Sequence, residues 1–188
     1  MVGDATQTKK RLLEAAADEF AERGMAGARV DRIAQQAGAN KALIYSYFGS
    51  KEQLFEAVFE SLVTTFVEST PITADNLPDY VGRLYDRYED DPRLLRLAAW
   101  YQLERAATAG MPKAAQQANA KKHAALGAAQ QQGALTKTFS ADALMTIVFG
   151  LSSMWAFVKL GDTSKTSVTQ RAERRRVAVE AMTRILNG

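Results

Sequence analysis

Several side chains directly after Gly38 are of the types that contact duplex DNA. Lys41 and Ser46 are candidates for base contacts, because an ammonium donates to guanine O6 or N7 and a hydroxyl hydrogen-bonds with either base type. Ala42 and Leu43 offer apolar contact to a thymine methyl group. Together these residues predict a short surface that reads base edges in a groove of DNA.

Phosphate contacts are predicted for Tyr45, Tyr47 and Lys51, whose hydroxyl and ammonium groups donate to phosphate oxygens. Residues 23–51 contain five Lys or Arg residues and one acid, Asp31, so this segment carries a charge of +4 while the rest of the chain sums to −1. A polyanion is attracted to such a segment. Two simpler interpretations stay open: the lysines are only solvated, and Tyr45 packs as much as it hydrogen-bonds.

Two short helices must position these side chains. Residues 30–37 and 41–47 show helical periodicity, and a three-residue turn of the length typical of a helix-turn-helix joins them. Asn40 is expected to cap the second helix. In such a unit the second helix enters the major groove with its first turns at the base edges, while Ile44 and Phe48 must face the core.

Helical periodicity continues along the whole chain, and no sustained alternating run of β-branched residues predicts a strand. Polar residues before the later helices, and glycines or prolines between them, supply caps and breaks. Ser50, Asn76 and Ser140 are expected N-caps. The remaining predicted helices cover residues 6–23, 50–70, 77–89, 92–109, 112–132, 140–160 and 167–186.

The composition excludes several other classes of protein. The chain of 188 residues has no cysteine, so disulfides and cysteine-bound zinc are excluded, and we expect no metal site and no cofactor. The polar N-terminus does not resemble a secretory signal, so a cytoplasmic location is expected. The 16 residues 143–158 carry no charge, but they are too few to cross a bilayer and predict a buried helix, with no membrane partner.

The stretch LLEAAADEFAERGMAGARVDRIAQQAGANKALIYSYFGSKEQLF resembles the DNA-binding domain of the TetR family of bacterial transcriptional regulators. The resemblance covers roughly residues 8–55 and rests on apolar residues, alanines, glycines and a final Ser-Lys-Glu at the spacing typical of the family. The matching residues are Leu12, Leu13, Ala16, Phe20, Gly24, Ile33, Ala34, Ala37, Gly38, Ile44, Tyr45, Phe48, Ser50, Lys51 and Glu52.

The chain departs from the family pattern at four positions that lie among the matching ones. Ala28 and Arg29 stand where the family often has Thr or Ser, so phosphate contact there depends on the charge of Arg29. Asn40 replaces the usual Ser and still caps. Ala42 replaces a frequent Gly. The details of phosphate contact therefore depend on this chain's own residues.

The resemblance implies an all-α fold with an N-terminal three-helix DNA-binding head, residues 1–50, and a C-terminal helical domain for ligand binding and dimerisation, residues 51–188. It implies a repressor that binds a palindromic double-stranded operator as a homodimer and is released by a small-molecule effector that the sequence does not identify. One short recognition helix reads few bases, so two copies are also expected on physical grounds.

The resemblance places the dimer interface in the last two helices and the effector pocket in the middle helices. The open alternative is that these apolar and aromatic side chains only complete the core of one chain. Candidate interface residues are Leu144, Ile147, Leu151, Val168, Ala172, Val179, Met182 and Leu186. Candidate pocket residues are Tyr85, Trp100, Tyr101, Met145, Phe149 and Trp155.

The sequence also bears on three other functions. An enzyme is disfavoured because the single histidine, His123, has no nucleophile, phosphate loop or metal-ligand cluster beside it in the sequence. A helical interaction module without DNA does not account for the charge of +4 in residues 23–51. A transcriptional activator of the same family fits the sequence as well as a repressor does, because the sign of regulation depends on where the operator lies relative to the promoter.

Overall fold

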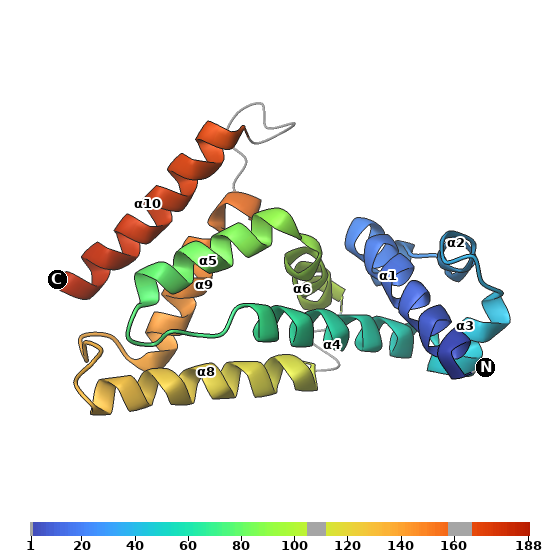
Figure 1. Cartoon of the computed structure of the whole chain (residues 1–188), viewed down its shortest axis with the longest axis horizontal. Helices are drawn as coiled ribbons and strands as arrows, with labels where there is room; N and C mark the ends of the chain where they lie inside the picture. Colours follow the sequence, from blue (N-terminus) through green and yellow to red (C-terminus); the bar gives the residue numbers. More distant parts are fainter. Residues whose placement is uncertain (1, 105–111, 158–166) are drawn as a thin grey trace. The chain divides into compact units, whose positions relative to one another are not determined.

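The computed structural model describes residues 2–104, 112–157 and 167–188, and these residues form helices and no strand (Figure 1). The all-α prediction is therefore confirmed, and no described helix has both the length and the apolar character needed to span a bilayer. The predicted helix ends at 109 and 160 lie outside the described residues. The helices are α1 (Val2–Gly27), α2 (Val30–Gln36), α3 (Lys41–Phe48), α4 (Lys51–Ser69), α5 (Leu77–Asp90), α6 (Arg93–Glu104), α8 (Lys113–Gln131), α9 (Ala141–Phe157) and α10 (Val168–Asn187).

The predicted caps account for several of these boundaries. Asn40 Oδ1 accepts from the N–H of Ala42 at 2.9 Å, and Asn76 Oδ1 accepts from the N–H of Asp79 at 3.2 Å. The hydroxyls of Ser50 and Ser140 accept from backbone N–H groups three residues later. Each cap satisfies a donor that the first turn of a helix leaves without a partner.

The chain divides into two compact units, each described by itself. Unit 1 contains the described residues up to Phe66 and those of 93–116, and unit 2 contains 67–92 and the described residues of 117–188. Unit 1 includes α1 to α3, most of α4, and α6, which packs against α1.

The core of unit 1 is built around aromatic rings from three helices. Phe20 of α1 meets Phe55 of α4 edge to face, with ring centroids 5.1 Å apart. Tyr101 of α6 stacks on Phe55 at 6.1 Å and lies 5.8 Å from Phe59. Such pairs stabilise a core beyond the burial of their area. Tyr101 is therefore a core residue of unit 1, where the sequence predicted a pocket residue.

Gly24 allows α6 to approach α1 closely. Its φ of +68° is in the left-handed region, and a Cβ atom there would lie 2.8 Å from the Trp100 ring and 2.5 Å from Glu104. The predicted helix end at Gly24 is a kink, after which one further turn reaches Gly27. Glu104 Oε2 accepts from the N–H groups of Met25 and Ala26 at 3.0 and 3.3 Å, so it caps that last turn from another helix.

A buried carboxylate connects α1 to α2. The Glu19 side chain, 6% exposed, accepts the backbone N–H of Arg29 at 2.9 Å and Arg32 Nε at 2.8 Å, and Arg32 Nη2 also donates to it. Arg29, the N-cap residue of α2, makes no side-chain cap of its own. Burial raises the pKa of Glu19, but the hydrogen bonds from Arg32 and Arg29 lower it more, so the pKa lies below its usual value.

In unit 2, α5 packs against both α9 and α10. Gly82 permits the close approach of α10, because a Cβ atom there would lie 2.8 Å from the Arg175 guanidinium. Arg175 Nε donates to Asp86 at 2.7 Å, and Arg171 Nη1 donates to Asp90 at 2.7 Å. These ion pairs join α10 to α5 and partner two arginines of the basic run 171–176.

We expect Glu19→Gln to lower the free energy of unfolding at pH 7 by about 1–3 kcal/mol, because charge-assisted hydrogen bonds to α2 are weakened. The folded-state pKa of Glu19 is lowered, so its contribution is present above the unfolded-state pKa and is lost as pH falls through the folded-state pKa.

Urea unfolding at pH 7 and at pH 3 measures both effects. The difference between wild type and the variant should shrink at the lower pH. Glu22→Gln, at an exposed carboxylate three residues along α1, is the matched control. A difference that is equal at both pH values would contradict the assigned role of Glu19.

Candidate nucleic-acid interface

The recognition helix predicted from the sequence is α3, and both of its ends are fixed locally. Asn40 caps its first turn, and Gly49, with φ of +81°, ends it. Ile44 is fully buried and Phe48 is 8% exposed, as the sequence predicted. Because these two residues face the core of unit 1, the opposite side of α3 must face solvent.

That solvent-facing side carries most of the predicted base and phosphate contacts. Lys41, Ala42, Tyr45 and Ser46 are exposed, whereas Leu43 and Tyr47 are half-buried at the edges of the face. Tyr45 is 44% exposed, which is unusual for a large aromatic residue beside a core helix. An exposed face with an ammonium and two hydroxyls has the donors that base edges and phosphates accept.

Lys41 is paired in this structure. Its Nζ lies 2.9 Å from Asp31 Oδ1 of α2, and the side chains are 47% and 58% exposed. The hydrogen bond between them raises the pKa of Lys41 and lowers that of Asp31, so both groups are charged at neutral pH. Any other acceptor would therefore have to replace Asp31 as the partner of Lys41.

Arg29 and Lys51 flank the face differently. Arg29 is exposed at the N-terminus of α2. Lys51 is half-buried at the first position of α4, and its Nζ donates to the carbonyl oxygen of Ala28 at 3.3 Å. Lys51 thus connects α4 to the link between α1 and α2, a structural role that the sequence did not indicate beside its predicted phosphate contact.

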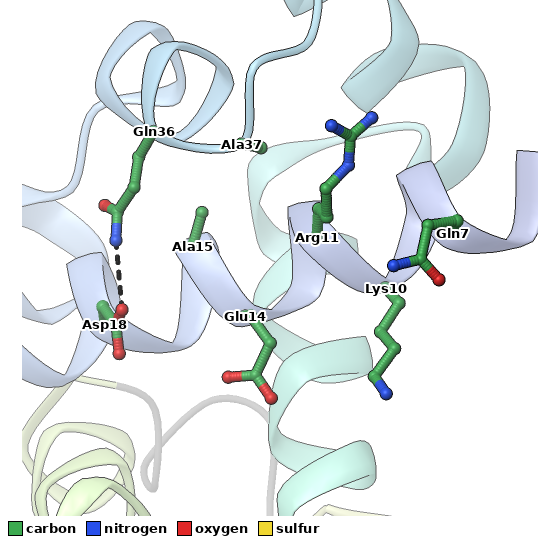
Figure 2. A pocket seen from close by; sticks show the side chains of 8 residues that line it. All are labelled: Gln7, Lys10, Arg11, Glu14, Ala15, Asp18, Gln36 and Ala37. Atoms are coloured by element: carbon green, nitrogen blue, oxygen red, sulfur yellow. Dashed lines mark hydrogen bonds between the residues drawn. The ribbon is translucent and has the colours of Figure 1, made fainter. Parts of the chain in front are cut away.

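A groove of about 300 Å³ lies along α1 and reaches Ala37, the C-cap residue of α2. Figure 2 shows the side chains that line it. At one end the Gln36 amide donates to Asp18 at 3.0 Å. Lys10 and Arg11 lie toward the other end, with Arg11 near Gly38. The ammonium of the preceding residue, Lys9, lies 5.6 Å from the centre of the Phe48 ring. Lys9 of α1 thus lies beside α3, and Arg11 lies beside the turn that precedes α3.

The six predicted pocket residues are distributed over both units. Tyr85, Met145, Phe149 and Trp155 are in unit 2, whereas Trp100 and Tyr101 pack in unit 1. Within unit 2, Tyr85 is 1% exposed and Trp155 is half-buried, with the Arg174 guanidinium 5.2 Å from the centre of the indole ring. Phe149 is 48% exposed and lies on the outer side of α9.

The predicted dimer residues also divide into two groups. Leu144 and Met182 have no exposed surface, so they belong to the core of a single chain and offer no area to a partner. The other six keep exposed surface, up to 87% for Val168. On α9, Phe149 and Phe157 are exposed and eight residues apart, so they share a face that the predicted residues did not include.

Sequence reasoning missed the role of Glu19, although a signal was available. Glu19 lies three and four residues after the buried Ala16 and Ala15, so it falls on the apolar side of α1. An acid on the apolar side of a helix predicts a buried cationic or N–H partner. Glu104 carried no such signal, because its partners lie nearly eighty residues away in the sequence.

Comparison with known proteins supports the resemblance to the TetR family. Residues 12–58 match the model of the bacterial regulatory proteins of the tetR family, and residues 76–184 match the tetracyclin repressor-like C-terminal domain. The HTH-type transcriptional repressor SCO4008 of Streptomyces coelicolor is 40% identical over 157 residues, which cover 82% of this chain and 81% of the relative.

Solved structures of other proteins match the fold of this chain over nearly its whole length. The putative transcriptional regulator SCO4942 from Streptomyces coelicolor has a TM-score of 0.81 and 34% identity, and the match covers 95% of this chain and 97% of that one. The regulator FadR from Bacillus subtilis, in complex with stearoyl-CoA, has a TM-score of 0.67 over 92% of this chain and 96% of its own, and at 17% identity it shows the fold alone. The chain belongs to the TetR family of bacterial transcriptional regulators.

Proposed function

We propose that this protein is a repressor that binds a palindromic operator as a homodimer through α3 and is released by a small-molecule effector. The observation that carries the proposal is the exposed face of α3, where Lys41, Tyr45 and Ser46 lie together opposite the buried Ile44 and Phe48. A capped helix with one buried apolar side and one exposed polar side has the shape and the hydrogen-bond donors that fit a major groove.

An unpartnered apolar surface on unit 2 supports dimerisation. Phe149 and Phe157 are 48% and 55% exposed on one side of α9, where a single chain leaves two phenyl rings in water. Exposed apolar patches of this kind are typical of protein interfaces. A twofold dimer uses the same patch from each copy and presents two α3 helices to two half-sites.

Buried polar atoms in unit 2 support an effector site. Among the described residues, the Tyr80 and Tyr85 hydroxyls, Arg87 Nε and Trp155 Nε1 are buried with no hydrogen-bond partner. Burial raises the pKa of Tyr80 and of Tyr85 to about 12, so both hydroxyls keep their protons. Buried donors normally have partners, and a ligand with oxygen acceptors would supply them. FadR, of the same fold, was crystallised with stearoyl-CoA.

An effector releases DNA only if it binds one arrangement of the protein more tightly than another. For this chain the proposal is therefore that effector binding in unit 2 favours a dimer whose two α3 helices no longer match adjacent grooves. Whether the bound protein represses or activates depends on the position of the operator. A promoter fusion with and without the protein distinguishes the two.

Our first test of the proposal uses two substitutions on α3. Duplexes selected from a random library by the purified protein provide an operator, and footprinting should give two half-sites about one helical turn apart. Tyr45→Phe removes one phosphate donor, so it should weaken binding to every duplex about five- to tenfold. Lys41→Ala should instead change the base preferred at one position of each half-site.

Anisotropy titrations against single-base variants of the selected duplex measure both effects. Ser61→Ala, at an exposed position of α4, is a control that should alter neither affinity nor preference. Equal loss for Lys41→Ala on all duplexes would reject its base-reading role, and selection of no duplex by the wild type would reject operator binding.

A second prediction concerns the dimer. Phe149→Asp should convert the protein to a monomer, because two carboxylates would be buried without partners in a twofold interface. Sedimentation velocity measures the state, and circular dichroism checks the fold. Ala120→Asp places the same charge at an exposed position of α8 and should remain dimeric. A dimeric Phe149→Asp protein would place the interface elsewhere.

A third prediction concerns the buried hydroxyls. Tyr80→Phe and Tyr85→Phe remove oxygen atoms that have no hydrogen-bond partner among the described residues, so neither should lower the free energy of unfolding by more than about 0.5 kcal/mol. Urea unfolding without added ligand measures this. For comparison, Thr8, a buried hydroxyl that accepts from Arg11, should lose about 1 kcal/mol when changed to Val. Losses above 1 kcal/mol for the tyrosines would show that the folded protein itself uses these hydroxyls.

A further inference from the structure

Positive charge without an acid partner gathers at the start of α1. Of the cations in α1 to α3, Arg23, Arg32 and Lys41 have acid partners. Lys9 and Lys10 are exposed and have no ion-pair partner in the part of the chain that the structure describes. A cation beside an anion attracts a polyanion little, so the uncompensated charge of these helices lies largely in the first turns of α1.

The next acids along α1 are already held by another helix. Arg93, the first residue of α6, lies 2.7 Å from Glu14 Oε2 and 3.1 Å from Asp18 Oδ1. Glu14, one turn after Lys10 in Figure 2, is therefore bound to Arg93 and not to Lys10. The fold of unit 1 thus uses these carboxylates to join α6 to α1 and leaves the two lysines to solvent.

The start of α1 lies beside the end of α3 (Figure 1). The Lys9 ammonium is 5.6 Å from the centre of the ring of Phe48, the last residue of α3. That ring in turn lies 6.3 Å from the ring of Tyr47, for which the sequence predicts a phosphate contact. An ammonium over an aromatic ring keeps donors for other acceptors, so Lys9 can bind a phosphate without leaving the ring.

We propose that Lys9 and Lys10 bind phosphates of the duplex that flank the base pairs read by α3. The inference rests on the proposed operator binding. The first turns of a recognition helix meet the base edges, whereas these lysines lie beside its last residue. A DNA strand that passes Tyr47 carries a further charge about every 3.4 Å along the helix axis, so its next phosphates come within reach of a lysine side chain.

Such contacts add affinity without adding sequence preference, because phosphates are the same in every duplex. Each phosphate that a protein neutralises releases counterions and adds about one to the slope of log affinity against log salt. The two helices therefore have different tasks in this proposal. The exposed face of α3 selects the bases, and the start of α1 supplies attraction to the backbone outside the half-site.

The test compares wild type with the double variant Lys9→Gln/Lys10→Gln on the operator selected by the wild type, extended by one helical turn of DNA at each end. Titrations run from about 50 to 200 mM salt. A dimer carries two copies of each lysine, so the slope should become shallower by about three to four and the low-salt affinity should fall more than about tenfold. The preferred bases should stay the same.

A shorter duplex locates the contacts. It ends at the outermost base pair for which the wild type shows a preference, so the flanking phosphates are absent. Trimming the duplex and substituting the lysines remove the same contacts, so their effects should not add. On the shorter duplex, wild type and the double variant should therefore bind within about twofold of each other.

Two further variants serve as controls. Lys121→Gln/Lys137→Gln removes the same charge from exposed positions of unit 2 and should keep the wild-type slope. Lys9→Arg/Lys10→Arg keeps the charge at the start of α1 and should also keep the slope. Glutamine, arginine and lysine have similar helix propensities, and circular dichroism checks that each variant folds.

The outcomes separate this inference from the proposed function. If the wild type selects a duplex but Lys9→Gln/Lys10→Gln keeps its slope and affinity, the role of the two lysines is overturned and operator binding stands. The same conclusion follows if the loss is undiminished on the shorter duplex, if Lys121→Gln/Lys137→Gln flattens the slope equally, or if the arginine variant loses as much as the glutamine variant. If the wild type selects no duplex, both the proposed function and this inference fall.

Discussion

The buried Glu19 carboxylate determines how the first three helices are arranged. It accepts the backbone N–H of Arg29, which begins α2, and the guanidinium of Arg32 one turn later. Hydrogen bonds to a charged acceptor in a poorly solvated site are strong, and a buried carboxylate without them is costly. Together with the hydrogen bond from Gln36 to Asp18 and the buried apolar side of α2, these bonds orient α2 relative to α1. Since α3 packs against α2 and is joined to it by a short turn, the direction of its exposed face depends on the same carboxylate.

Glu19 of α1 and Asp31 of α2 differ in how far their carboxylates are exposed to solvent. Glu19 is buried and organises the fold, so its contribution is present whether or not DNA is bound. Asp31 is 58% exposed, and its carboxylate lies 2.9 Å from the ammonium of Lys41. In the first pair only the carboxylate is buried, whereas both side chains of the second are about half exposed. Water therefore screens the second pair more than the first.

The two units also differ in whether their buried polar side chains have hydrogen-bond partners. In unit 1 the buried Glu19 and Thr8 have partners within the unit. In the described part of unit 2, four buried donors from α5 and α9 have none. If the site were only an apolar core, phenylalanine at positions 80 and 85 would stabilise it more than tyrosine, because no buried hydroxyl would lack a partner. Retention of such groups is typical of binding sites, where strain or unmet hydrogen bonds are tolerated because a ligand meets them.

The sequence by itself determined the helices, their caps and the buried side of α3, because these depend on residues within a few positions of one another. Asn40, Ser50 and the burial of Ile44 follow from local spacing and donor chemistry. Only the tertiary structure decided that Trp100 and Tyr101 pack against α1 and α4, that Leu144 and Met182 belong to the core of one chain, and that Lys41 meets Asp31. Periodicity identifies which side of a helix is apolar. It does not identify the element that covers that side, because helices distant in the sequence meet through shape and charge that no local pattern records.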